Sequence, residues 1–214
     1  GVAADDYQTA EAALKLIEVN YDVQPFVIDF QEARKDGAPL VFTQQVEQEE
    51  TGGGGGGAKG VPQRGNVRGP SKKSFLGGPR GDVKQGFAEA DVIVEGAFKT
   101  QVQTHSALET HGVVADWKPN LLTVYSSTQE TKGVRRELAD VFELPESKIR
   151  VICEYMGGGF GAKYGAGHYG IIAVNLSKRA NRPVKLMLDR KAEHLCVGNR
   201  PSTWENLKIG AKKD

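Results

Sequence analysis

The chain has 214 residues and a net charge of +1, with 28 Lys and Arg against 27 Asp and Glu. This length suits one or two domains, and the balanced charge, without a basic stripe interleaved with aromatic residues, argues against nucleic-acid binding. No apolar run is long enough for a membrane span and no signal peptide is visible, so we expect a cytoplasmic protein, with the periplasm as the alternative. Cys153 and Cys196 are predicted to be buried free thiols rather than a disulfide.

The N-terminal segment, residues 1–48, combines short helical and extended patterns. Asp5 or Asp6 can cap a helix over about 9–17, where apolar residues recur on one face. The alternation of residues 19–23 predicts a strand, and residues 30–35 predict a second short helix. The segment has too little apolar surface for an independent domain, so we expect it to dock on the rest of the protein.

Residues 49–84 have a different composition. Six consecutive glycines, Gly52 to Gly57, are followed by basic residues set among Pro and Gly. Such a segment has high backbone entropy and little surface to bury. The composition therefore predicts a linker, with no regular secondary structure over the glycine run.

Regular patterns return from residue 85 onward. Apolar alternation predicts a strand over 92–98, and a turn at Pro119 and Asn120 joins the next two strands in a hairpin. The later elements predicted in chain order are a helix after Thr131, a strand over 148–155, a helix over 170–178, a strand over 183–189, and a strand around 207–209. This mixture of a hairpin with βαβ crossovers predicts an α+β (mixed α/β) fold. The last strand has no evident partner, which leads us to expect a longer native chain.

A glycine-rich motif, MGGGFGAK at residues 156–163, lies between a predicted strand and a predicted helix. Without Cβ atoms, residues 157–159 allow positive φ and let a ligand approach the main chain closely. Free N–H groups at the start of the following helix would favour an anion there. The alternative is a tight turn that binds nothing.

Two familiar phosphate loops can be compared with this motif. The P-loop pattern fails because Ala162, rather than glycine, precedes Lys163. The dinucleotide fingerprint is matched by Gly157, Gly159 and Ala162, although the candidate acid, Asp189, comes later than usual. A Rossmann-type nucleotide-binding module therefore stays open as an alternative, and so does a non-catalytic assembly domain.

His105, Glu109 and His111 lie close together in one segment. A zinc site would need three or four such ligands, and a site with two histidines and one carboxylate would suit iron. The interpretation we favour is that they are hydrogen-bonded polar residues beside a pocket.

Four motifs occur in an order and spacing that resemble one family. They are residues 103–111 (QTHSALETH), 127–129 (STQ), 156–163 (MGGGFGAK) and 182–190 (RPVKLMLDR). Together they resemble the molybdenum-cofactor-binding large subunit of the xanthine dehydrogenase and aldehyde oxidase family. The resemblance would make residues 85–214 the first, incomplete part of a molybdopterin-binding domain. More weakly, residues 1–48 resemble the end of a hammerhead domain, joined to it by the linker 49–84.

The resemblance implies a molybdenum–molybdopterin cofactor, in bacteria often a cytosine dinucleotide. It also implies 2Fe-2S and FAD groups on partner subunits or domains, which carry electrons away, and a partner in the remaining C-terminal part of the same subunit. The implied reaction is hydroxylation of an aldehyde or an N-heterocycle, with oxygen taken from water.

The resemblance also assigns residues to the site. Gln103 matches a glutamine that hydrogen-bonds an oxygen ligand of the metal, Phe160 an aromatic residue beside the substrate, and Gly161 a backbone position close to the metal. Gly158 and Gly159 would shape the loop, and no side chain would bind the metal directly. We expect Gln103, Phe160 and Gly161 to converge on one pocket, with the Gly161 amide positioning a ligand of the metal.

Two departures from the family pattern bear on substrate and catalysis. Tyr164 stands where purine-hydroxylating members carry a glutamate that holds the substrate, so Tyr164 would border the substrate and an aldehyde is favoured. The family's catalytic glutamate and arginine-bearing motif have no match within this sequence. The resemblance therefore implies a general base beyond Asp214, and we expect this chain alone to be inactive.

Overall fold

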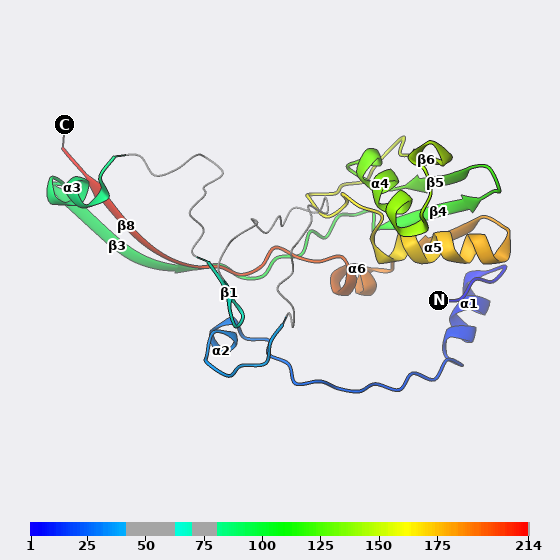
Figure 1. Cartoon of the computed structure of the whole chain (residues 1–214), viewed down its shortest axis with the longest axis horizontal. Helices are drawn as coiled ribbons and strands as arrows, with labels where there is room; N and C mark the ends of the chain where they lie inside the picture. The colour runs from blue at the N-terminus through cyan, green and yellow to red at the C-terminus, as the bar shows by residue number, and fades with distance from the viewer. Residues whose placement is uncertain (42–62, 70–80, 214) are drawn as a thin grey trace. The chain divides into compact units, whose positions relative to one another are not determined.

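The computed structural model describes residues 1–41, 63–69 and 81–213, whose elements are shown in Figure 1. The chain divides into two compact units. Among the described residues, the first unit comprises 1–21 and 103–200, and the second comprises 22–41, 63–69, 81–102 and 201–213. The glycine run for which we predicted no regular structure lies outside the described residues.

The first unit is built on a four-stranded sheet with the order β6-β5-β4-β7. Its strands are β4 (Gly112–Trp117), β5 (Leu122–Ser126), β6 (Ile149–Ile152) and β7 (Val184–Met187). The antiparallel pair β4–β5 confirms the predicted hairpin, and its turn is closed by hydrogen bonds between Lys118 and Leu121. β6 lies parallel to β5, as the βαβ pattern predicted, whereas β7 pairs antiparallel with β4 at the opposite edge. The combination of helices with a mixed sheet confirms the α+β class.

Two helices pack on this sheet: α4 (Thr131–Phe142) against β6, and α5 (Gly167–Ala180) against β4 and β7. The predicted helix after Thr131 is confirmed as α4; its residues Val134 and Leu138 are fully buried, whereas Val141 is exposed. The core consists of apolar side chains from the sheet and both helices: Val113, Ala115, Leu122, Val124, Val134, Leu138, Ala139, Ile149, Ala166, Ala173 and Val174. Each of the Val, Leu and Ile side chains in this core contributes about 1.5–3 kcal/mol through removal of apolar surface from water, before the entropy of ordering it is subtracted.

Shorter elements complete the first unit: α1 (Tyr7–Leu14), the 3-10 helix η1 (Glu146–Lys148) and α6 (Arg190–Cys196). The carboxylate of Asp6 accepts a hydrogen bond from the Thr9 N–H at 2.8 Å, which confirms the predicted cap and places the helix slightly earlier than expected. Cys153 and Cys196 are free thiols, as predicted, but neither is fully buried: Cys153 is half-buried and Cys196 is exposed. Cys196 is exposed because it lies on α6, where Glu193 is the buried residue.

The second unit contains α2 (Phe30–Ala33), β1 (Gln63–Arg64), β2 (Val67–Arg68), α3 (Val83–Ala88), β3 (Val92–Lys99) and β8 (Trp204–Ala211). β3 and β8 form a two-stranded antiparallel ribbon. The turn of the β1–β2 hairpin carries Asn66, whose side chain accepts from the Val41 N–H and donates to the carbonyl oxygens of Ala33 and Pro39. The predicted linker segment therefore contains regular structure within its described part.

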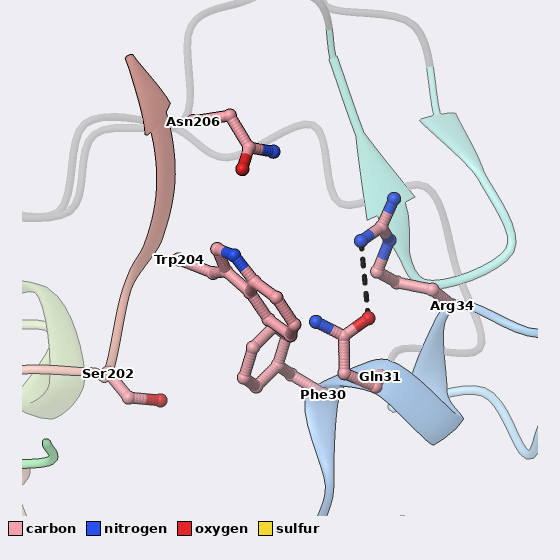
Figure 2. A pocket seen from close by; sticks show the side chains of 6 residues that line it. All are labelled: Phe30, Gln31, Arg34, Ser202, Trp204 and Asn206. Atoms are coloured by element: carbon pink, nitrogen blue, oxygen red, sulfur yellow. Dashed lines mark hydrogen bonds between the residues drawn. The ribbon is translucent and has the colours of Figure 1, made fainter. Parts of the chain in front are cut away.

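A pocket of about 410 Å³ lies between α2 and β8 (Figure 2). The rings of Phe30 and Trp204 meet edge to face, with centroids 6.2 Å apart. Gln31, Arg34, Ser202 and Asn206 supply the polar part of the lining. None of the residues assigned to a site from the sequence lines this pocket.

Two expectations about strands are wrong. Residues 19–23 form no strand, because no neighbouring segment pairs with their alternating apolar residues among the described ranges. The strand near the C-terminus does have a partner, since β8 pairs with β3 along its whole length. Period-two alternation identifies a candidate strand but does not identify its partner. No helix in the described part of the chain is both long and apolar enough to cross a membrane.

Candidate cofactor-binding loop

The glycine motif is longer and more irregular than the turn expected from the sequence. β6 ends at Ile152 and α5 begins at Gly167, so the motif lies within an extended connection (Figure 1). Gly158 and Gly161 have φ of 101° and 95°, conformations that glycine adopts without strain. Phe160 also has positive φ, at 53°, which is uncommon for a residue with a side chain and is found often at functional sites.

One end of this loop is held by the carboxylate of Glu109. The Gly157 N–H donates to Glu109 Oε2 at 2.7 Å, and the Ser127 hydroxyl donates to the same oxygen at 2.6 Å. Burial raises the pKa of Glu109, but the hydrogen bonds from Ser127 and Gly157 and the charge of Lys163 outweigh burial and hold that pKa below its usual value. Glu109 is therefore ionised at neutral pH, and it fixes the start of the loop to the segment 103–111.

Lys163, at the other end of the motif, points into the protein. Its side chain has an exposed fraction of 0 %. Its Nζ donates to the Glu109 carbonyl oxygen at 2.8 Å and to the Ser127 hydroxyl at 2.7 Å, and it lies 3.3 Å from Glu109 Oε2. A buried ammonium group must be paired and hydrogen-bonded to be tolerated, and these contacts do both. Lys163 therefore anchors the loop and cannot reach a ligand outside it.

A second buried ionisable pair holds the middle of the motif. His111 Nδ1 lies 2.9 Å from Glu193 Oε1, and the His111 N–H donates to Glu193 Oε2 at 2.7 Å. The other ring nitrogen of His111 lies 3.0 Å from the carbonyl oxygen of Ala162. Both ring nitrogens of His111 thus face oxygen atoms of the protein. Burial raises the pKa of Glu193. The hydrogen bonds from His111 and the charge of Lys163 outweigh burial and hold that pKa below its usual value.

The side chain of Gln129 lies inside the loop. Its Oε1 accepts hydrogen bonds from the N–H groups of Gly161 at 2.9 Å and Lys163 at 3.3 Å. The expectation that the Gly161 amide positions a ligand of the metal does not fit this conformation, because that N–H already donates to Gln129.

Three other main-chain groups remain available. Within the described part of the chain, the N–H groups of Gly158, Gly159 and Phe160 have no hydrogen-bond partner. Gly159 is buried, and buried N–H groups are rarely left unpaired in proteins. A Cβ built on Gly161 would meet no atom within 4 Å, so space is open beside the loop. A run of unpaired donors that ends at this open position suits a ligand rich in oxygen acceptors.

Gln103 lies on a separate segment of the same unit. Its N–H donates to the Arg200 carbonyl oxygen at 3.1 Å, and the Arg200 N–H donates back at 2.8 Å, so its backbone is fixed while its side chain is exposed. The segment that follows Gln103 reaches the loop, because Glu109 binds Gly157 and a Cβ on Gly158 would lie 3.4 Å from the Cβ of Ala107. The structure thus brings the two predicted motifs together, whereas convergence of the Gln103 side chain with Phe160 stays a prediction.

Phe160 and Tyr164 differ in their surroundings. Phe160 is 72 % exposed, so its ring is free to contact a substrate or another part of a larger protein. Tyr164 is half-buried, and its carbonyl oxygen packs so closely on α4 that a Cβ on Gly133 would lie 2.8 Å from it. Contact of either ring with a substrate remains a prediction.

The helix start after the loop was expected to favour an external anion. The structure places the protein's own carboxylate there, since Glu137 Oε2 accepts from the Ala166 N–H at 2.7 Å. A Cβ on Gly165 would collide with that carboxylate, at 2.3 Å. The donors available to a ligand are therefore in the loop and not at the N-terminus of α5.

The hypothesis of a metal site at His105, Glu109 and His111 is not supported. Among the described residues, no group of three His, Cys, Asp or Glu side chains has a geometry that could hold a metal ion. Glu109 and His111 instead form the protein hydrogen bonds described above, as we favoured, whereas the buried Nδ1 of His105 has no hydrogen-bond partner among the described residues.

Sequence reasoning missed three residues of this region. Gln129 belongs to a motif that carried the resemblance, but its role in the loop could not be read from its position. Lys163 was compared only with a phosphate-binding lysine, although the structure makes it an internal anchor. No sequence pattern indicated that Glu193 belongs to this region, because only the tertiary structure brings α6 beside His111.

Comparison with known proteins identifies the family. The family described as the molybdopterin cofactor-binding domain matches residues 68–214. This chain belongs to it. The Rossmann alternative is accordingly wrong, since the β7 strand lies at the far edge of the sheet and Asp189 caps α6 through the Ala192 N–H.

Individual relatives agree with this assignment. The aldehyde oxidoreductase molybdenum-binding subunit PaoC of Escherichia coli O157:H7 is 35 % identical over 131 residues, which are 61 % of this chain and 18 % of that protein. The probable hypoxanthine oxidase XdhD of the same organism is 30 % identical over 238 aligned residues, covering 100 % of this chain and 23 % of that protein. The structure of quinoline 2-oxidoreductase from Pseudomonas putida 86 aligns with a TM-score of 0.71 at 25 % identity, covering 98 % of this chain and 24 % of that one. The chain thus spans about a fifth to a quarter of these relatives.

Proposed function

We propose that this chain forms part of the molybdenum-cofactor subunit of a hydroxylase that oxidises an aldehyde or an N-heterocycle with oxygen from water. The observation that carries the proposal is the loop of the family motif, in which Gly158, Gly159 and Phe160 keep unpaired N–H groups and the next residue, Gly161, has open space at its Cβ position. When bound, the molybdenum–pterin cofactor, which could carry a cytosine dinucleotide, would accept two electrons from the substrate. The residues present fit such an oxygen-rich group.

This chain's own residues would bind the cofactor and orient the substrate beside it. The N–H groups of Gly158, Gly159 and Phe160 would donate to cofactor oxygens, and the Gln103 amide would donate to an oxygen ligand of the metal. Gly161, which lacks a Cβ, would allow close approach, and Phe160 and Tyr164 would border the substrate. The general base is expected beyond Asp214, in the remaining part of the subunit.

Three further features belong to the proposal. Electrons would leave through 2Fe-2S and FAD groups on partner subunits or domains, as the resemblance implies. Residues 1–48 would be the end of a hammerhead domain, 49–84 a linker, and 85–214 the start of the molybdopterin-binding domain. The two free cysteines are consistent with a cytoplasmic location, where thiols stay reduced.

An aldehyde is the favoured substrate class. Tyr164 replaces the glutamate that purine-hydroxylating members use, and PaoC, which is named an aldehyde oxidoreductase, is the more identical of the two curated relatives over its aligned region. The probable hypoxanthine oxidase keeps an N-heterocycle as the second candidate.

The test uses the complete enzyme that contains this chain. We expect molybdenum and pterin to co-purify, and aldehyde oxidation to be detected with an artificial electron acceptor. The Gln103→Ala variant should keep its molybdenum and lose about 10²–10³-fold in kcat, the usual cost of removing one donor to a developing oxyanion. Gln101→Ala, two residues earlier and also exposed, is the matched control and should retain activity. Purification with a nicotinamide or flavin nucleotide bound to this chain, or with nothing, would overturn the proposal.

A further inference from the structure

The conformation of the glycine loop depends on the side chain that it surrounds. Gln129 binds the last part of the loop three times: its own N–H donates to the Lys163 carbonyl oxygen at 2.7 Å, and its Oε1 accepts from Gly161 and from Lys163. One residue therefore fixes the course of the chain from 161 to 163. The unpaired N–H groups lie immediately before this fixed stretch.

Gly159 shows how closely the loop follows this side chain. A Cβ on Gly159 would lie 2.4 Å from Gln129 Oε1 and 2.6 Å from both its Cδ and its Cγ. Gly159 is not among the residues with positive φ, so its backbone conformation alone does not require glycine. The requirement comes from Gln129, whose carboxamide occupies the space that a Cβ would need.

Gln129 is itself held by the core of the first unit. It directly follows Thr128, which is buried at the end of β5 and donates its hydroxyl hydrogen to the Lys163 carbonyl oxygen at 3.0 Å. Glu130, the N-cap residue of α4, follows Gln129 and donates its N–H to the Thr128 hydroxyl at 3.0 Å. The carboxamide is thus presented from a rigid connection between a core strand and a core helix.

We propose that Gln129 is a positioning residue: its carboxamide sets the loop conformation in which Gly158, Gly159 and Phe160 present unpaired N–H groups to the cofactor. Gln129 would act through the loop and not by touching the reacting atoms. The part of the proposal that concerns the cofactor rests on the proposed function, whereas the part that concerns loop conformation does not.

The first experiment compares two substitutions of Gln129 in the complete enzyme. Gln129→Met keeps the length of the side chain but removes the acceptor, and Gln129→Glu keeps an acceptor oxygen. In Gln129→Met, the rate of amide hydrogen exchange at Gly161 and Lys163 should rise about tenfold, because losing a hydrogen bond of about 1.4 kcal/mol changes an equilibrium tenfold. The molybdenum content per subunit should fall several-fold for the same reason. Gln129→Glu should restore both measurements to near the parent values. Gln85→Met, which removes an exposed hydrogen bond to Glu89, is the matched control and should change neither.

The second experiment is a double-mutant cycle between positions 129 and 159. Gly159→Ala should release molybdenum in the parent, because its Cβ collides with the carboxamide. In a Gln129→Ala background the same substitution should add little, since the space is then empty, and this non-additivity is what contacting residues show. Thermal unfolding of each variant separates loop effects from global ones, and we expect the Tm of Gln129→Met to stay within a few degrees of the parent.

The outcomes distinguish this inference from the proposed function. Parent enzyme without molybdenum, but with faster Gly161 exchange in Gln129→Met, would overturn the proposed function and uphold the loop assignment. Parent enzyme with molybdenum, and a Gln129→Met variant equal to it in exchange and metal content, would overturn the inference. An additive double-mutant cycle would also overturn it.

Discussion

The two compact units of this chain are stabilised in different ways. The first has a continuous apolar core and, beside it, a charged interior in which Lys163, Glu193 and His111 are almost inaccessible to solvent. In the second, no described residue is buried. Its ribbon of β3 and β8 carries apolar side chains that remain exposed, among them Phe98 and Ile209.

The difference indicates which unit can determine its own fold. A core and a satisfied polar interior stabilise one conformation, whereas a two-stranded ribbon is at best marginally stable by itself in water. Exposed apolar ribbons are usual where another part of a larger protein packs. The candidate loop belongs to the first unit, so its geometry rests on the unit that has an apolar core.

The largest effect should come from breaking the charged interior. Lys163→Met leaves Glu109 without its buried partner and removes the donor to the carbonyl oxygens of Glu109 and Thr110 and to the Ser127 hydroxyl, and we expect a loss of about 3–5 kcal/mol in the free energy of unfolding. Urea denaturation followed by circular dichroism measures it. Lys35→Met is the control, because Lys35 makes an exposed pair with Glu32, and it should cost less than about 1 kcal/mol. Equal losses in the two variants would mean that the charged interior does not stabilise the first unit.

A pair of apolar truncations addresses the two units directly. Leu138→Ala, at a fully buried position of α4, should cost about 2–5 kcal/mol through lost transfer energy and the cavity it leaves. Ile209→Ala, on the exposed ribbon, should change the free energy of unfolding by about 0.5 kcal/mol or less. The measurement is again urea denaturation, with the unfolding of each unit followed by hydrogen exchange. A large cost at Ile209 would show that the second unit has a core of its own, and the comparison would fail.

The smallest expected effect is a difference in acid sensitivity. The pKa of Glu193 is lowered in the folded state, so its contribution to stability is present above the usual glutamate pKa and is lost as pH falls below that value and through the lowered folded pKa. Glu193→Gln should therefore be less stable than the parent at about pH 7, but should lose less stability on going to about pH 4. Thermal unfolding at both pH values tests this.

The control for acid sensitivity lies in the second unit. Glu89 has a pKa lowered by its exposed hydrogen bonds to Lys212 and Gln85. Because solvent screens such a pair, Glu89→Gln should keep nearly the acid sensitivity of the parent. If it changed that sensitivity as much as Glu193→Gln, buried and exposed carboxylates would contribute alike, and the contrast between the units would not extend to their charges.

The sequence by itself determined the features that depend on neighbouring residues. Asp6 and Asp29 cap helices because their carboxylates reach N–H groups two or three residues ahead. The β4–β5 hairpin follows from two apolar strands around a short turn, and the apolar face of α4 follows from its spacing. The glycine motif could be identified for the same reason: its residues are consecutive in the sequence.

Only the tertiary structure decided what those features contact. The pairing of β3 with β8 joins Thr100 to Thr203, 103 residues apart, and no local pattern specifies it. The partners of the loop are equally distant in sequence: Glu109, Gln129 and, through His111, Glu193. Alternation and helical periodicity report which face of an element is buried, whereas the identity of a buried charge's partner depends on how separate elements pack. That is why the motif could be found in the sequence and the residues that hold it could not.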